Sequence, residues 1–217
     1  MRSFVAATFA FVLALAAPSR ASGPPQPPRE DCPTADPDSS QVTVIFEGAA
    51  RGVGVRDVVT IAPDGRGDTF ASQGITVTLV AKYATGVPAA WIPRQAIVLW
   101  ASGLCVCPGG NFADEATNID GRTTFHGTLA GGGFASGLQV YVDGVRVGDV
   151  PLRINSPDLN ADCAVDGSDL SALAVHLGSR AGEPRYTLAA DFNEDGSVDA
   201  SDLSCLAIFL RSRCAPW

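Results

Sequence analysis

The sequence predicts a mainly β fold, a β-sandwich, followed by a small all-α module, and two observations carry this prediction. Residues 41–155 contain short runs of alternating β-branched and apolar residues separated by turn signals, without helical periodicity. Residues 156–217 contain an acidic loop followed by an apolar helical pattern, and this unit occurs twice. A chain of 217 residues is long enough for two such domains.

The N-terminal residues predict export. Arg2 precedes the apolar run Phe4–Ala17, which is too short to span a bilayer, and small residues follow at Ser19 and Ala21. We therefore expect residues 1–21 to be a signal peptide and the protein to be secreted, either extracellular or at the cell surface. Residues 22–40 form a Pro-rich leader that favours extended structure. No other segment is long and apolar enough to predict a membrane span.

The charge balance argues against a nucleic-acid partner. The formal net charge is -8, and removing Arg2 and Arg20 with the signal makes the mature chain still more acidic. Binding to phosphate backbones requires clustered Lys and Arg, but Lys82 is the only lysine.

The expected strands of the sandwich follow one another closely along the chain. They are Gln41–Phe46, Val58–Ile61, Ile75–Ala81, Ala96–Trp100, Arg122–Gly127, Leu138–Val142 and Val145–Val147. The dipeptide Asp143-Gly144 between the last two predicts a two-residue hairpin turn.

This β region also resembles a bacterial immunoglobulin-like (Ig-like) domain. Gly86-Val87-Pro88 lies between two predicted strands, and Asn118–Thr124 has the spacing of that family's entry into a later strand. The insertion Gly103–Gly110 departs from the family pattern. The resemblance implies a spacer or binding domain.

The C-terminal repeat consists of two loops that begin at Asp158 and Asp191, 33 residues apart. Each loop is followed by apolar residues at helical spacing, which predicts an amphipathic helix. In the first helix these residues are Leu170, Leu173, Ala174 and Leu177, and in the second Leu203, Leu206, Ala207 and Leu210.

The spacing of oxygen-bearing side chains in these loops predicts two EF-hand-like calcium sites. Calcium takes six to eight oxygen ligands from a flexible loop, with a backbone carbonyl at position 7. The first candidate set is Asp158, Asn160, Asp162, Ala164, Asp166 and Asp169, and the second is Asp191, Asn193, Asp195, Ser197, Asp199 and Asp202. Between Asp158 and Asp202 there are ten acidic and two basic residues, so this segment repels itself without cations.

Position 6 of each loop distinguishes the two sites. This position needs a positive φ angle, which glycine adopts without strain. Gly196 meets the requirement in the second loop, whereas the first loop has Cys163. We therefore expect the second site to be stronger, unless a disulfide at Cys163 holds the strained turn.

Residues 157–217 resemble a type I dockerin, whose duplicated D-x-N-x-D-G-x-V-D-x-x-D-L loop both repeats match except at Cys163. The resemblance implies noncatalytic docking onto a cohesin-bearing scaffold or cell-surface protein, in two permitted orientations. Loop positions 10 and 11 then contact the cohesin; here they are Gly167, Ser168, Ala200 and Ser201. The alternative is a calcium-stabilised structural or carbohydrate-binding surface protein that has no cohesin partner.

We expect no catalytic residues. The two histidines are His126 and His176, and neither lies near a serine in a nucleophile-elbow context. The adjacent acids Asp114 and Glu115 are more typical of a solvated turn than of a glycosidase pair.

The six cysteines favour disulfides, since the signal peptide predicts an oxidising compartment. The candidates are Cys32, Cys105, Cys107, Cys163 and Cys214. Antiparallel packing of the two helices would bring Cys163 near Cys214, and Cys32 would then pair with Cys105 or Cys107. Cys205 has no clear partner. A metal site at Cys105-Val106-Cys107 is disfavoured because no further ligand lies at suitable spacing.

Overall fold

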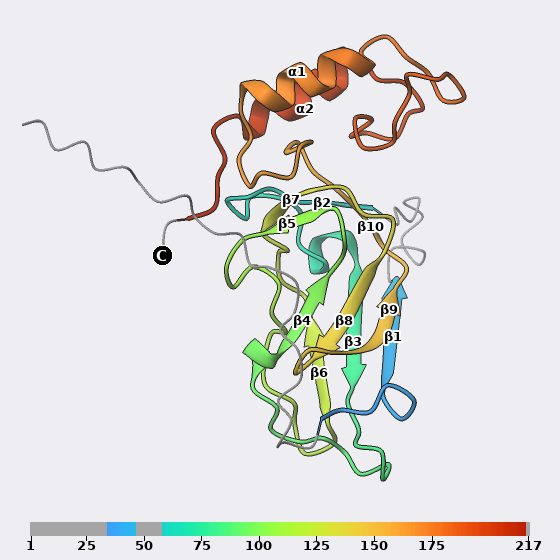
Figure 1. The fold of residues 1–217 in the computed structure, drawn as a ribbon, viewed down its shortest axis with the longest axis vertical. Helices are drawn as coiled ribbons and strands as arrows, with labels where there is room; N and C mark the ends of the chain where they lie inside the picture. The colour runs from blue at the N-terminus through green and yellow to red at the C-terminus, as the bar shows by residue number, and fades with distance from the viewer. Residues whose placement is uncertain (1–33, 47–57, 216–217) are drawn as a thin grey trace, which may run out of the picture.

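A computed structural model describes residues 34–46 and 58–215 of the chain. The predicted signal peptide, most of the Pro-rich leader and Cys32 lie outside the described residues. The described chain consists of a β region and, above it in Figure 1, two helices with their loops. No helix among these residues is long and apolar enough to cross a membrane.

The β region forms several small sheets. Its strands are β1 (Gln41–Phe46), β2 (Val58–Thr60), β3 (Ile75–Val80), β4 (Ile97–Trp100), β5 (Leu104–Val106), β6 (Arg122–Phe125), β7 (Gly131–Gly133), β8 (Leu138–Val142), β9 (Val145–Val150) and β10 (Arg153–Asn155). The sheet orders are β1-β3-β6, β4-β8-β9, β5-β7 and β10-β2, of which only the last pairing is parallel. Two short 3₁₀ helices, Ala71–Gln73 and Arg94–Ala96, precede β3 and β4.

One hydrophobic core connects these sheets. Ile75, Val77 and Leu79 of β3 are fully buried and pack in the same cluster as Leu99 of β4 and Val140 of β8. Alternation along β3 therefore places every second side chain in the core, as the sequence predicts. The seven predicted strand runs are confirmed as strands, whereas their arrangement as a sandwich stays a prediction.

The predicted hairpin between β8 and β9 is confirmed. Val142 pairs with Val145, and the turn residues Asp143 and Gly144 have φ angles of 47° and 80°. Positive φ at both central residues is the geometry of a type I′ turn, whose twist matches that of the flanking strands.

The two helices, α1 (Gly167–His176) and α2 (Ala200–Phe209), begin with the same capping box. Asp166 and Asp199 are the N-cap residues, and the carboxylates of Asp169 and Asp202 accept hydrogen bonds from the N-cap N–H groups. Because each box consists of loop residues, the loop and the start of its helix form one local unit.

The predicted apolar face of each helix is only partly buried. In α1, Leu173 is buried, but Leu170 and Leu177 are both 43% exposed. Asp169 must point into the loop, and this fixes the buried line of the helix along Asp169 and Leu173, one turn apart. Leu206 of α2 is buried in the same cluster as Leu173, and the core of the module is completed from outside the helices by Val165, Ala190, Phe192 and Val198.

The β region passes directly into the first loop. Asn155 ends β10, and Ser156 and Pro157, both buried, are the only residues before Asp158. The Asn155 side chain donates hydrogen bonds to the carbonyl oxygens of Asp191 (3.2 Å) and Leu188 (3.3 Å). The last strand therefore contacts the second loop as well as leading into the first.

Candidate metal centre

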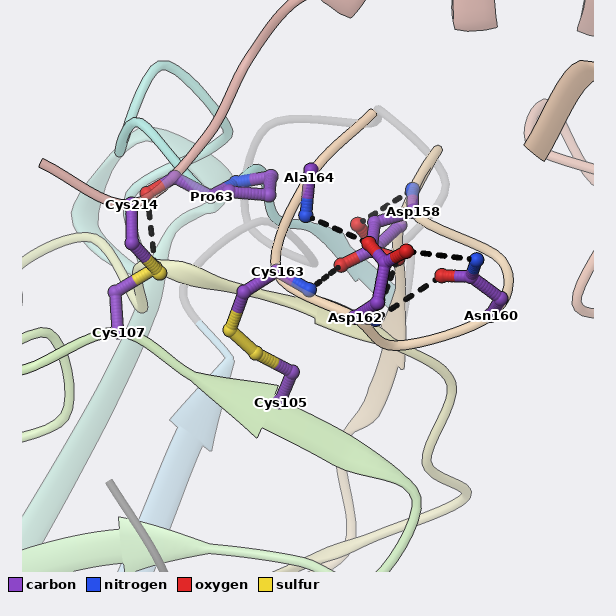
Figure 2. Close-up of a disulfide and its surroundings, with 10 residues drawn as sticks. Pro63, Cys105, Cys107, Asp158, Asn160, Asp162, Cys163, Ala164 and Cys214 are labelled. Atoms are coloured by element: carbon purple, nitrogen blue, oxygen red, sulfur yellow. Dashed lines mark hydrogen bonds between the residues drawn. A yellow bond between two sulfur atoms is a disulfide. The ribbon is translucent and has the colours of Figure 1, made fainter. Parts of the chain in front are cut away.

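The first acidic loop wraps around the carboxylate of Asp158. Asp158 accepts hydrogen bonds from the backbone N–H groups of Asp162 (3.2 Å) and Cys163 (2.8 Å). Asn160 Oδ1 accepts from the N–H of Asp162, and Asp162 Oδ1 accepts from the N–H of Ala164. These turns direct the oxygen-bearing side chains of positions 1, 3 and 5 toward the inside of the loop, as Figure 2 shows.

The second loop repeats the hydrogen bonds made by positions 1 and 3 of the first. Asp191 accepts from the N–H groups of Asp195 (3.2 Å) and Gly196 (2.9 Å), and Asn193 Oδ1 accepts from the N–H of Asp195. Asn193 Nδ2 also donates to Ser201 Oγ, just as Asn160 Nδ2 donates to Ser168 Oγ. The predicted ligand positions of the two loops are thus equivalent in structure as well as in sequence.

Position 12 closes each loop with a buried aspartate. Asp169 accepts from the N–H groups of Asp166 and Asn160, and Asp202 accepts from the N–H groups of Asp199 and Phe192. The shorter aspartate therefore reaches the loop where EF-hand sensors use glutamate.

Burial leaves these carboxylates in need of positive charge. Desolvation and, to a smaller extent, the neighbouring charge of Asp169 together raise the pKa of Asp158 to about 7. Desolvation also raises the pKa of Asp169 and of Asp202. A buried cation would favour the ionised form of all three groups.

The donor set fits calcium. Each loop offers carboxylate and amide oxygens at five positions and a backbone carbonyl at position 7, and oxygen ligands of this kind suit a hard divalent cation. The hydrogen bonds to the loop N–H groups hold these donors around a common centre. A bound calcium ion would supply the positive charge that the buried carboxylates lack.

Two positions of each loop have left-handed backbone. Position 6 has φ angles of 69° at Cys163 and 84° at Gly196, as predicted from the loop pattern. Position 4 also has φ of 56° in both loops, at Ala161 and Glu194, which the residue types did not predict. The first loop therefore contains two strained non-glycine residues and the second loop one.

Reciprocal backbone hydrogen bonds join the two halves of the module. The N–H of Val165 in the first loop donates to Ser212 after α2, and the N–H of Val198 in the second loop donates to Ser179 after α1. The chain after each helix thus supports the opposite loop.

The cysteine prediction was wrong in its pairing. Cys163 is bonded to Cys105 and Cys214 to Cys107, so the predicted Cys163–Cys214 bridge does not form and Cys32 has no available partner at Cys105 or Cys107. The predicted proximity does hold, because the N–H of Cys214 donates to the carbonyl of Cys163 (3.3 Å). The sulfur atoms of Cys163 and Cys214 are bonded instead to Cys105 and Cys107, in the segment of the β region that begins at β5 (Figure 2).

The two disulfides also determine whether the cysteine cluster can bind a metal ion. Within the described ranges, the sulfur atoms of Cys105, Cys163 and Cys214 lie within 4.8 Å of one another. Metal binding requires thiolates, and both disulfides consume them. Cys205 is the free cysteine among the residues described, as expected.

The predicted partner-contacting residues are exposed at the helix starts. Gly167, Ser168, Ala200 and Ser201 all lie on the surface, at equivalent places in the two halves. The backbone N–H and the hydroxyl group of Ser168 both donate to Asp166, and the hydroxyl group and N–H of Ser201 both donate to Asp199; these bonds hold the pKa of both carboxyl groups below its usual value.

The histidines lie away from the acidic loops. His126 Nδ1 is 2.8 Å from Asp114 Oδ2 on the exposed surface, and Thr124 also donates to this carboxylate. His176 Nδ1 contacts the carbonyl oxygen of Arg185. Among the described residues, no serine hydroxyl is hydrogen-bonded to either histidine ring.

Comparison with known proteins identifies the C-terminal region. Residues 156–211 match the family described as dockerin type I domain. Comparisons with curated proteins and with solved structures found no match. The resemblance of residues 41–155 to an Ig-like domain has no support from these comparisons and stays a prediction. Residues 156–211 are therefore a dockerin type I domain, a module that binds calcium and docks to cohesin.

Proposed function

We propose that this is a noncatalytic secreted protein that binds two calcium ions and uses them to present its dockerin domain to a cohesin-bearing scaffold or cell-surface protein. The observation that carries the proposal is the equivalence of the two loops. Each has a buried position-1 aspartate and ends in a capped helix with an exposed serine in its first turn. Two disulfides support the extracellular location, because such bonds persist in oxidising compartments.

The proposed docking face continues along both helices. Val175 and Ile208 lie seven residues, or about two turns, after Ser168 and Ser201 on the same side of each helix, and they are 62% and 66% exposed. Apolar side chains that are exposed on an otherwise acidic module favour a protein partner.

Calcium binding is tested by titrating the full chain in a calorimeter. We expect two calcium ions per chain. Asp169→Ala and Asp202→Ala are each expected to remove one site and to leave the other, because each aspartate closes its own loop. Binding of two ions by both variants would contradict the assignment of these ligands.

Docking is tested by replacing Ser168 and Ser201 with arginine, singly and together. Since the two serines occupy equivalent positions, each single variant keeps one unchanged serine and therefore one of the two orientations of the cohesin. We expect the double variant to bind a type I cohesin about 100-fold more weakly and each single variant to bind nearly as well as the parent. Surface plasmon resonance in calcium measures this, and equal loss in one single variant would exclude symmetric docking.

A second candidate function is carbohydrate binding by the β region, which we propose has a sandwich arrangement of Ig-like type supported by its shared core. Trp100 of β4 and Tyr141 of β8 form an edge-to-face pair with centroids 6.2 Å apart, and both are partly exposed. The Tyr141 hydroxyl donates to Gln139 beside them. Aromatic side chains with neighbouring amide groups suit sugars, and loss of polysaccharide retention in Trp100→Ala would support this function.

A further inference from the structure

The first calcium loop lies on the glycine strand β7. The N–H of Gly133 donates to the backbone carbonyl of Asp158 at 2.7 Å, and the Asp158 carboxylate lies directly over Gly132. A Cβ atom at Gly132 would overlap that carboxylate. Gly132 has no positive φ angle, so the requirement for glycine here is one of space. The position-1 ligand of the loop is thus seated on the β region and fully buried.

The Cys105–Cys163 disulfide joins the same two elements. Cys105 is the register partner of Gly132 across the β5-β7 pair, and Cys163 is position 6 of the loop. The Cα atoms of the two cysteines are 5.6 Å apart, and both residues are buried. The N–H of Cys163 donates to Asp158 Oδ2, so the disulfide is one hydrogen bond away from the ligand (Figure 2).

The second loop has different supports. Its position 6 is Gly196, which adopts the left-handed backbone without strain, and the nearest atom to an added Cβ there is that of Ala181, at 3.8 Å. The phenol of Tyr186, within the module, donates to Asp191. The first loop therefore has a strained residue where the second has glycine, and a covalent bond to the β region where the second has none.

We propose that Gly132 and the Cys105–Cys163 disulfide are positioning elements of the first calcium site. The disulfide holds Cys163 in the left-handed turn, the turn directs its N–H to Asp158, and the glycine strand leaves room for the carboxylate. The first site is thus joined to the β region by a covalent bond and a close glycine contact, whereas β10 reaches the second loop noncovalently, through the Asn155 hydrogen bonds and the Arg153–Glu194 ion pair. This inference rests on the proposed calcium binding.

The full chain with paired cysteine substitutions tests this inference in a calcium titration. In Cys105→Ser/Cys163→Ser, we expect the first site to weaken at least about tenfold and the second to stay unchanged, because the serine keeps the strain without the bond. In Cys105→Ser/Cys163→Gly, the affinity should recover in part, because glycine relieves the strain. Equal losses in the two variants would show that the disulfide does not act by holding the left-handed backbone of residue 163, and would contradict this part of the inference.

Cys107→Ser/Cys214→Ser is the matched control, since it removes the other disulfide and leaves Cys163 bonded. Hydrogen exchange in chelator gives a second readout. Residues 158–169 should exchange faster in the Cys105→Ser/Cys163→Ser variant than in the control, while residues 191–202 stay the same. Similar exchange of residues 158–169 in both variants would overturn the proposal.

Gly132→Ala tests the glycine strand independently. We expect it to lose calcium from the first site, whereas Gly137→Ala, whose added Cβ would meet the nearest atom at 3.5 Å, should bind as the parent does. Unchanged binding of both ions by Gly132→Ala would overturn its assigned role. A parent protein that binds no calcium would refute the proposed function itself, and a parent that binds two ions with unaffected variants would refute only this inference.

Discussion

Replacing Cys107 and Cys214 by serine is expected to lower the free energy of unfolding by about 4 kcal/mol, because with Cys105–Cys163 still in place the bond closes a ring made of residues 105–107 and 163–214 in the unfolded chain. The two residues are 107 positions apart, and both are buried at the junction of the β region and the dockerin domain. Urea unfolding in calcium, followed by tryptophan fluorescence, measures the difference.

Cys205→Ser is the control for this change. Cys205 is partly exposed on α2 and is not in a disulfide, so its replacement should alter the free energy of unfolding by less than about 1 kcal/mol. Mass spectrometry of the parent should show the loss of four hydrogen atoms from these two bonds. If the paired variant unfolds at the same urea concentration as the parent, the Cys107–Cys214 bond does not contribute to stability.

The calcium-free protein is expected to become less stable as the pH rises from 5 to 8. Burial, together with the charge of Asp169, raises the pKa of Asp158 from 3.8 to about 7 in the folded state. A folded-state pKa above the unfolded value favours the folded, protonated form. Its contribution is therefore fully present below about pH 4 and is lost as the pH rises through 7. The full shift corresponds to up to about 4 kcal/mol, of which about 3 kcal/mol is lost between pH 5 and 8.

Urea midpoints measured in chelator at several pH values check this prediction, and Asp158→Asn should flatten the profile because asparagine does not titrate. With calcium present the direction reverses, since the cation binds the ionised carboxylate. A calcium-free parent whose midpoint rises between pH 5 and 8 would contradict the buried position of Asp158.

The sequence was sufficient for the parts of the molecule that are fixed locally. Calcium loops have their ligands within twelve residues, so the spacing from Asp158 to Asp169 predicts both the turns and the first helix. Alternation likewise predicts β3, and Asp143-Gly144 predicts the β8-β9 hairpin.

Other parts depend on contacts between distant segments. Strand β7 consists of three glycines, which give no alternation and have low β-propensity, so the sequence does not predict a strand there. Only the structure shows that the Asp158 carboxylate lies over Gly132 of this strand. The pairing of Cys163 with Cys105 depends on the β region lying beneath the loop, which nothing in the repeat reveals. Leu170 and Leu177 were expected on the buried face because the helical period does not show how narrow the contact between two short helices is.

The two disulfides also determine how the molecule responds to tension. Residues 105–107 and residues 163–214 are joined at both ends, so they form a closed covalent ring that contains both helices. If a partner docked on the helices is pulled away from the β region, these bonds would share the load with the backbone at residues 155–158 and carry it to the β5 segment. The ring would also limit how far the helices can extend, because Cys163 and Cys214 stay bonded to Cys105 and Cys107.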